Sequence, residues 1–267
     1  MIKTPNLIID PEWLVERIHD RTVRTVDLRD RDAFADRHIP GAVQLDLEDL
    51  GESRGGCENV LLPPASFEAL MARLGITDRD TVVAYDEQWG LASARLVWAL
   101  HHYGHQAAVV LNGGWDRWQE EGRPSTAELP PETPAGFKAG ADPAVSADYE
   151  WISATVARGD VRLLDTRTQA EFDEGHLPGA TCWDWFNAVP DGSWNCSRDP
   201  DELRSELAEL GVHPSDEIVA YCRSGMRAAH TYVVLRHAGF PRVRLYDGSW
   251  QEWSMRREPD PAKGDDL

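Results

Sequence analysis

An internal duplication constrains the fold of this chain more than any other feature. Residues 27–42 read DLRDRDAFADRHIPGA and residues 165–180 read DTRTQAEFDEGHLPGA, at an offset of 138 residues (165 − 27). Two more pairs follow in the same order: TVVAYD with EIVAYC at an offset of 136 (217 − 81), and NGGWDRW with DGSWQEW at 135 (247 − 112). Three blocks in one order at nearly constant offsets indicate two copies of one domain.

The boundary between the copies is expected in the segment RPSTAELPPETPAGFKAGADP, residues 123–143. It holds five prolines and lacks apolar periodicity, so it cannot form a continuous helix. We therefore expect a first domain in residues 1–123, a proline-rich linker in residues 124–143 and a second domain in residues 144–267.

Within each copy, short apolar runs alternate with helical segments, a pattern typical of a parallel sheet covered by helices. The fold class is therefore predicted to be α/β, with two tandem domains, each a small parallel sheet with helices on both faces. The tryptophans spaced three apart, at 115/118 and 250/253, are expected to pack on the sheets. The expected strands are residues 23–27, 42–46, 81–85, 107–111, 161–165, 180–184, 217–221 and 243–246, and the clearest helices are residues 64–74, 91–103 and 226–238.

Charge and cysteine usage exclude several classes of function. The 46 acidic residues against 27 basic ones give a net charge of −19, which disfavours nucleic acid and anionic membranes as partners. No apolar run approaches the length of a membrane span, and the N-terminus does not read as a signal peptide, so a cytoplasmic protein is expected. The four cysteines form no C-x-x-C pair, so neither a disulfide framework nor a zinc site is predicted.

Cys222 is the predicted catalytic residue, because it directly follows the apolar run EIVAY and opens the loop CRSGMR before a helix. Ligands of open α/β sheets bind beyond the carboxyl ends of the strands. Gly225 allows a tight turn, so that the backbone N–H groups of the loop and the helix N-terminus can surround an anion. Such surroundings favour a nucleophilic thiolate. The predicted anion-binding residues are Arg223, Ser224, Gly225, Met226 and Arg227.

The other copy serves as an internal control. Asp86 occupies the position of Cys222, so the first domain is expected to be unreactive and to close one side of the site in the second. Asp165 and Arg167 are expected to tie a strand end to the loop by charge-assisted hydrogen bonds, in a supporting role. The remaining thiols are expected to be inert, since none has such a loop around it: Cys57, Cys182 and Cys196.

Together these residues resemble the rhodanese family of sulfurtransferases over nearly the whole chain, as a tandem pair. The resemblance depends on the D-x-R-x-x-x-E-F-x-x-G-H-L-P-G-A segment of residues 165–180, the loop CRSGMR and the motif YDGSWQEW, with HIPGA, SAR (residues 93–95) and NGGWDRW in the first copy. It implies a double displacement in which Cys222 takes a sulfur from a donor as a persulfide. A thiol or cyanide then removes that sulfur, and neither a metal nor an organic cofactor is needed.

The loop leaves the donor open. Thiosulfate enzymes resemble C-R-K-G and mercaptopyruvate enzymes C-G-S-G, whereas this chain has C-R-S-G. Arg223 suits a dianionic donor and favours thiosulfate. Ser224 instead fits a Ser-His-Asp relay of the 3-mercaptopyruvate type, for which His38 and Asp27 are candidates. Glu171 stands where tandem members tend to carry a substrate-binding arginine, which weakens the expected affinity for anions.

Other functions stay open at this stage. A cysteine phosphatase needs C-x5-R, but only four residues separate Cys222 from Arg227. A sulfur relay that takes sulfur from, or gives it to, a protein partner without turning over small acceptors is a further alternative. Three histidines at positions 101, 102 and 105 suggest a metal cluster, although helix-terminal histidines more often cap carbonyls. Three tryptophans at positions 183, 185 and 194 could wall the mouth of the site.

Overall fold

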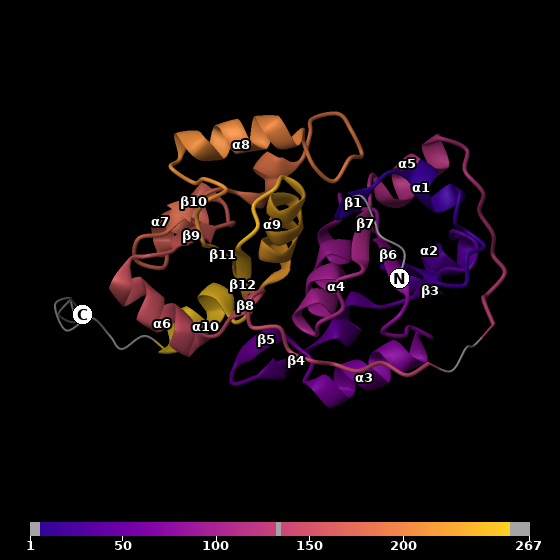
Figure 1. Ribbon diagram of the computed structural model, residues 1–267, viewed down its shortest axis with the longest axis horizontal. Coiled ribbons are helices and arrows are strands. Elements are labelled where there is room, and N and C mark those ends of the chain that lie inside the picture. Colours follow the sequence, from indigo (N-terminus) through magenta and orange to yellow (C-terminus); the bar gives the residue numbers. More distant parts are fainter. Residues whose placement is uncertain (1–5, 132–134, 257–267) are drawn as a thin grey trace.

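The computed structural model describes residues 6–131 and 135–256, and it folds into two domains, each built on a five-stranded parallel sheet (Figure 1). The strand order is the same in both, so the duplication in the sequence is a duplication in space. The first sheet runs β1 (Ile8–Ile9), β7 (Ala108–Leu111), β6 (Thr81–Tyr85), β2 (Val23–Asp27) and β3 (Val43–Gln44). The second runs β8 (Ser146–Ala147), β12 (Val243–Tyr246), β11 (Ile218–Tyr221), β9 (Arg162–Asp165) and β10 (Thr181–Cys182).

Helices cover both faces of each sheet, as the alternation of the sequence predicts. The first domain has α1 (Pro11–Val15), α2 (Arg31–Asp36), α3 (Pro64–Arg73), α4 (Leu91–His102) and α5 (Gly114–Glu120). The second has α6 (Tyr149–Arg158), α7 (Gln169–Glu174), α8 (Pro200–Glu209), α9 (Met226–His237) and α10 (Ser249–Arg256). The three clearest predicted helices end within one residue of α3, α4 and α9. The expected strands at residues 42–46 and 180–184 are shorter than predicted, since only β3 and β10 pair there.

The two faces of each sheet belong to different cores. In β6, Val82 and Ala84 join a core that runs through both domains, whereas Val83 and Tyr85 pack with Trp115 and Trp118 on the outer face. The second sheet repeats this division, and its outer core includes Trp253, with Trp250 packed against it. The predicted role of these four tryptophans in core packing is confirmed.

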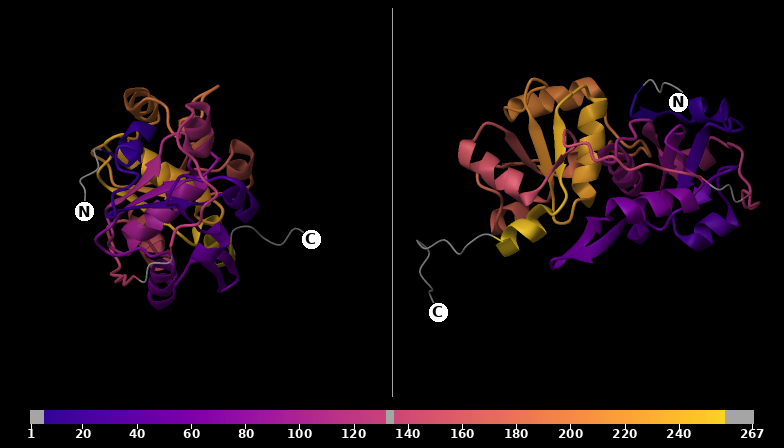
Figure 2. Two further views of the ribbon diagram at one scale, coloured as in Figure 1. Left: turned by 90° about the vertical axis from the view of Figure 1, so that its right-hand side faces the viewer. Right: turned by 60° about the horizontal axis from the view of Figure 1, so that its bottom comes forward.

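Helices α4 and α9 lie side by side between the two sheets and form the interface between the domains (Figures 1 and 2). Because each packs on its own sheet and on the other helix, ten residues of α4 and eight of α9 are buried. The shared core that results joins the two domains into one folded body.

Two short antiparallel strands, β4 (Gly51–Arg54) and β5 (Cys57–Leu61), follow the 3₁₀ helix η1 (Leu47–Leu50) and form a hairpin in the first domain. The equivalent part of the second domain holds the 3₁₀ helix η2 (Trp185–Ala188) and a loop. The apolar patterning of the sequence did not predict this hairpin, because its residues are largely polar or glycine. None of the helices in the described part of the chain is long and apolar enough to cross a lipid bilayer.

Candidate functional site

Cys222 is the first residue after β11, at the carboxyl edge of the second sheet, and its side chain is fully buried. The backbone of the loop is fixed by the first turn of α10. The N–H of Cys222 donates to Ser249 Oγ at 3.2 Å, while the N–H groups of Trp250 and Gln251 donate to the carbonyls of Cys222 (3.0 Å) and Arg223 (3.1 Å). The loop is therefore held from behind by backbone contacts, and its side toward α9 is left for the thiol.

Gly225 caps the N-terminus of α9 with a φ of +84°, a left-handed conformation that favours glycine. A Cβ atom at this position would lie 2.8 Å from Arg95 Nη1 and 2.9 Å from Asp247 Oδ1. Within residues 6–131 and 135–256, the backbone N–H groups of Arg223, Ser224 and Gly225 donate to no carbonyl or side chain. These donors, next to the N-terminus of α9, are available to an anion held near the thiol.

The equivalent loop of the first domain is occupied by its own carboxylate. Asp86 Oδ1 accepts from the N–H groups of Gln88 (2.8 Å) and Gly90 (2.9 Å), and Asp86 Oδ2 accepts from the N–H (2.8 Å) and hydroxyl (2.9 Å) of Ser93. Gly90 caps α4 with the same φ of +84° that Gly225 adopts. A loop of this kind thus holds an anion in this very chain. In the first domain the anion is a fixed side chain that blocks any ligand.

Arg227, in the first turn of α9, pairs with Glu171 of α7 in a bidentate ion pair, with N–O distances of 2.7 and 2.8 Å. The hydrogen bond from Arg227, opposed by burial and helped by Thr168, lowers the pKa of Glu171 to about 2. The pKa of Arg227 is raised, first by its hydrogen bond to Glu171 and then, against the opposing effect of burial, by the charge of Cys222. The guanidinium is therefore held against the Glu171 carboxylate at the start of the helix that follows the loop.

Asp165 and Arg167 form a buried ion pair at the end of β9, with Arg167 Nη2 2.6 Å from Asp165 Oδ2. Arg167 also donates to the carbonyl of Gly175 at 2.7 Å, which ties the segment before HLPGA to the strand. The first domain has the same arrangement in Asp27 and Arg29, at 2.7 Å. Because the pair occurs in both copies, including the one without a thiol, its contacts explain a supporting role and no part in the chemistry.

The first domain contributes Arg95, which sequence reasoning noted only as part of a motif. Its side chain is 2% exposed, reaches across the interface from α4, and lies 2.7 Å from Asp247 Oδ1 and 2.7 Å from the carbonyl of Asn59. Asp247 Oδ2 accepts in turn from the N–H of Leu61 on β5. These contacts bring the non-catalytic domain against Gly225. The sequence signal for this contact between the domains is an arginine in the middle of a largely apolar helical segment.

The Ser-His-Asp relay considered for Ser224 is not assembled. Nδ1 of His38 lies 2.8 Å from the carbonyl of Phe34, and Nε2 lies 3.2 Å from that of Glu128, so both ring nitrogens are engaged. Asp27 pairs with Arg29, as described above. Both candidates therefore serve the first domain and not the loop of the second.

The three tryptophans expected at the mouth of the site are separated in the structure. Trp183 is 2% exposed and donates through Nε1 to Glu206, so it belongs to the core and does not wall the mouth. Trp185 packs its ring edge-on against His230 of α9, with ring centroids 5.0 Å apart. Trp194 is 44% exposed. Trp185 therefore contacts the helix that follows the loop.

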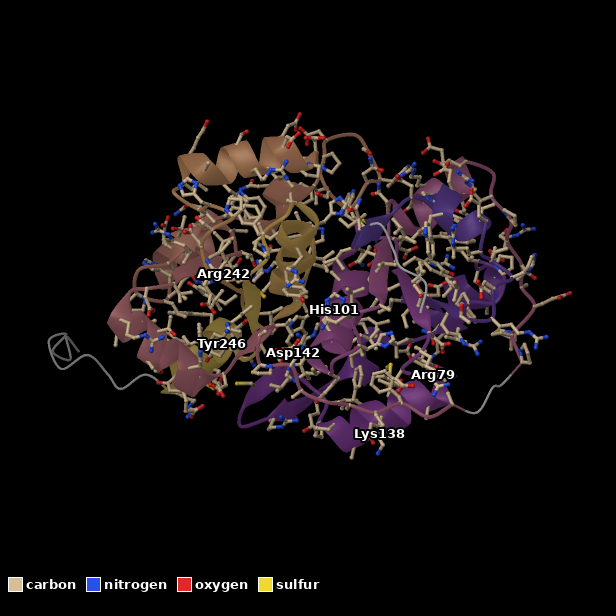
Figure 3. The ribbon with its side chains drawn as sticks, in the orientation of Figure 1. Arg79, His101, Lys138, Asp142, Arg242 and Tyr246 are labelled. Carbon is tan, nitrogen blue, oxygen red and sulfur yellow. The ribbon has the colours of Figure 1, made fainter. Side chains whose placement is uncertain are left out.

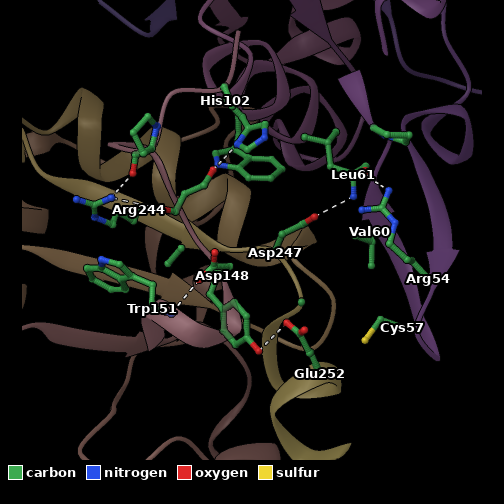
Figure 4. Close-up of a pocket in the computed structure, with 18 of the residues that line it drawn as sticks. Arg54, Cys57, Val60, Leu61, His102, Asp148, Trp151, Arg244, Asp247 and Glu252 are labelled. Carbon is green, nitrogen blue, oxygen red and sulfur yellow. Dashed lines mark hydrogen bonds between the residues drawn. The ribbon is translucent and has the colours of Figure 1, made fainter. Parts of the chain in front are cut away.

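The remaining thiols lie in surroundings that disfavour the thiolate. Burial raises the pKa of Cys182 to about 11 and that of Cys196 to about 12. Burial also raises the pKa of Cys57, helped by the nearby carboxylates of Glu252 and Asp247. Cys57 lines a cavity of about 1250 Å³ between the β4–β5 hairpin and α10 (Figure 4). Cys222 does not line this cavity, so the two thiols face different spaces.

The histidines at positions 101, 102 and 105 do not form a metal site. His101, labelled in Figure 3, lies on α4 between the domains, with Nδ1 3.0 Å from Tyr232 Oη and Nε2 3.3 Å from the carbonyl of Ala108. His102 Nδ1 lies 2.6 Å from Ser146 Oγ. Among the described residues, no group of three or more potential ligands is arranged to hold a metal ion. His101 and His102 instead contact residues of the second domain.

Comparison with known proteins agrees with this architecture. The family described as Rhodanese-like domain matches residues 10–121 and 148–256. The chain is 34% identical to the thiosulfate sulfurtransferase of Corynebacterium glutamicum, covering 96% of this chain and 90% of the relative. It is 31% identical to the sulfur carrier protein TtuD of Thermus thermophilus, covering 98% of each.

Among solved structures, the 3-mercaptopyruvate sulfotransferase SseA of Escherichia coli superposes with a TM-score of 0.83 at 26% identity, covering 92% of this chain and 99% of that one. The family match covers both halves of the duplication, and the superposition extends over both domains. The chain therefore belongs to the rhodanese family, as a tandem pair of rhodanese-like domains.

Proposed function

We propose that this protein transfers a sulfane sulfur from thiosulfate to a thiophilic acceptor through a persulfide on Cys222. The Cys222 thiolate attacks the outer sulfur of thiosulfate. A new S–S bond forms, the S–S bond of thiosulfate breaks, and sulfite leaves with the electron pair. Cyanide or a thiol then attacks the outer sulfur of the persulfide, and the Cys222 thiolate is released.

One observation carries this proposal: the two copies of the loop differ in what they can hold. The first loop uses its N–H groups on the Asp86 carboxylate, whereas those of Arg223, Ser224 and Gly225 donate to no other atom of the described chain. The second loop has a thiol where the first has the carboxylate. A negatively charged sulfur on Cys222 would be stabilised by these donors and by the guanidinium of Arg227.

Thiosulfate is the proposed donor because of the charge at the loop. Arg223 is exposed, and no carboxylate in the described part of the chain pairs with it, so its guanidinium is available to a dianion. The contacts of His38 and Asp27 within the first domain argue against a relay through Ser224, which a 3-mercaptopyruvate donor would use.

A protein acceptor is the second candidate, and the similarity to a sulfur carrier protein over 98% of both chains favours it. In this version Cys222 still becomes a persulfide, but the sulfur passes to a partner's thiol. A persulfide that forms with thiosulfate and persists in the presence of small thiols and cyanide would favour this route.

The test is steady-state formation of thiocyanate from thiosulfate and cyanide. We expect Cys222→Ser to lose this activity. Cys57→Ser should keep it, because Cys57 faces another cavity. Turnover that survives in Cys222→Ser would contradict the proposal, and a higher kcat/KM with 3-mercaptopyruvate than with thiosulfate would reverse the choice of donor. Hydrolysis of p-nitrophenyl phosphate that is lost in Cys222→Ser would point to a phosphatase instead.

A further inference from the structure

Glu171 places a negative charge beside the loop that is proposed to bind an anion. Both of its carboxylate oxygens accept from Arg227, at 2.7 and 2.8 Å, and the two side chains are 32% and 21% exposed. Arg227 lies in the first turn of α9, directly after the loop that Cys222 opens, so the carboxylate is held next to that loop. An anion that approaches Cys222 from this side meets a guanidinium whose charge is already paired with a carboxylate.

The carboxylate is held in place by its own helix. Glu171 is the third residue of α7 and completes a capping box with Thr168: Oε2 accepts from the N–H (3.2 Å) and hydroxyl (3.0 Å) of Thr168, whose Oγ accepts from the N–H of Glu171. Arg227 is held by the first turn of α9. The capping box therefore orients the Glu171 carboxylate independently of Arg227.

Two other arginines near the loop are also paired with carboxylates, so most of the positive charge around the loop is neutralised. Arg95 is neutralised by Asp247, and Arg167 by Asp165. With Arg227 neutralised by Glu171, Arg223 is left as the one of these four guanidiniums without a carboxylate partner in the described chain. The site therefore offers a dianion a single uncompensated positive charge.

We propose that Glu171 sets the charge selectivity of this site: by neutralising Arg227 it weakens the binding of a doubly charged donor such as thiosulfate more than that of a singly charged donor, and it leaves the dianion to Arg223 and the N–H groups of the loop. The inference rests on the proposed function. A dianion has to displace the carboxylate from Arg227 or bind beside it, and both cost binding free energy. A like charge a few ångströms away at a partly exposed site changes a binding constant by about tenfold.

Glu171→Gln tests this, because glutamine keeps the capping box and removes the charge. We expect the KM for thiosulfate to fall about tenfold, with kcat changed less than about twofold. For benzenethiosulfonate, a monoanion that loses sulfinate in the same displacement, we expect about half the change in free energy, hence about a threefold fall. The control is Glu174→Gln, which removes the same charge from an exposed position on α7 and should change neither KM by more than about twofold.

Binding without chemistry separates this inference from the proposed function. Calorimetric titration of thiosulfate into Cys222→Ser, with and without Glu171→Gln, measures the dissociation constant alone, which should fall about tenfold. A dissociation constant that does not depend on Glu171, or one that falls equally with Glu174→Gln, would overturn the inference even if wild type turns over thiosulfate. A constant that falls as expected in a protein without turnover would leave the inference intact and refute the donor.

Discussion

The two copies of the loop differ in the residue that opens them and in length, with three residues between Asp86 and Gly90 and two between Cys222 and Gly225. Asp86 and Cys222 both follow a central strand, and both loops end in a glycine with a φ of +84° that caps a helix. A carboxylate carries its own permanent charge and collects the N–H groups of its loop. A thiol at the same position leaves those donors to whatever anion binds or forms there. The chemistry proposed for the second domain thus depends first on the side chain that opens its loop.

Gly225→Ala is expected to disrupt the site for two reasons. The new Cβ would lie 2.8 Å from Arg95 Nη1, and alanine disfavours the left-handed φ. Gly211→Ala is the matched control, because Gly211 also has a positive φ but has no atom within 4 Å of its Cβ position. In urea unfolding, we expect a loss of about 1 kcal/mol for Gly211→Ala and roughly 2 to 4 kcal/mol for Gly225→Ala.

For these two variants, sulfur transfer should fall only in Gly225→Ala. Equal losses of stability in the two, with activity retained in both, would mean that the approach of Arg95 to the loop has no steric consequence.

At the scale of elements, α4 and α9 perform equivalent tasks for the two domains. Each begins at the end of its loop, packs on its own sheet and presents its other side to the partner helix. Arg95 extends this packing from α4 to the start of α9 and to Asp247 in the turn before α10. The first domain thereby contacts the loop that Cys222 opens and limits the space around Gly225.

Arg95→Met tests that contact. Methionine keeps much of the apolar stem but leaves Asp247 without its guanidinium partner in a largely buried place. We expect the free energy of unfolding to fall by roughly 2 to 4 kcal/mol. Arg73→Met removes the exposed pair with Asp49, where both side chains are more than a third exposed, and should cost less than about 1 kcal/mol. If both variants lose the same free energy of unfolding in urea, the interdomain pair stabilises the protein no more than an exposed pair does.

In the molecule as a whole, buried histidines make the interface between the two domains sensitive to acid. Burial, the largest cause, lowers the pKa of both His101 and His230 from 6.5 to about 4. His101 contacts Tyr232, and His230 contacts the carbonyls of Trp89 and Cys196, so both lie at the interface between the domains. Charging either one requires the interface to open or the histidine to carry its charge in the core.

The direction of the pH effect follows from these pKa values. Below about pH 6.5 the unfolded chain binds protons that the folded protein takes up only near pH 4. Stability should therefore be constant above pH 7 and fall as the pH drops from 6.5 to 4, by an amount on the order of 3 kcal/mol per histidine. Urea unfolding at a series of pH values checks this. The double variant His101→Gln/His230→Gln should flatten the curve, and a wild-type curve that is already flat in this range would refute it.

Most of the fold could be predicted from the repeat in the sequence, because both the strands and the loop after β11 depend on local patterns. The two ion pairs near the loop that join distant parts of the sequence could not be predicted. Glu171 and Arg227 are 56 residues apart, Arg95 and Asp247 are 152 apart, and each pair depends on how separate elements dock. The prediction that His38 could serve Ser224 was wrong because both of its ring nitrogens lie next to carbonyls, that of Phe34 four residues earlier and that of Glu128 90 residues later.

The mass of the intact protein shows directly whether Cys222 carries the transferred sulfur. After incubation with thiosulfate, the account predicts that wild type gains one sulfur, about 32 Da, and loses it when cyanide is added. Cys222→Ser should gain nothing, and Cys57→Ser should gain the same mass as wild type. A wild-type mass that does not change with thiosulfate, or a gain that persists in Cys222→Ser, would contradict the account.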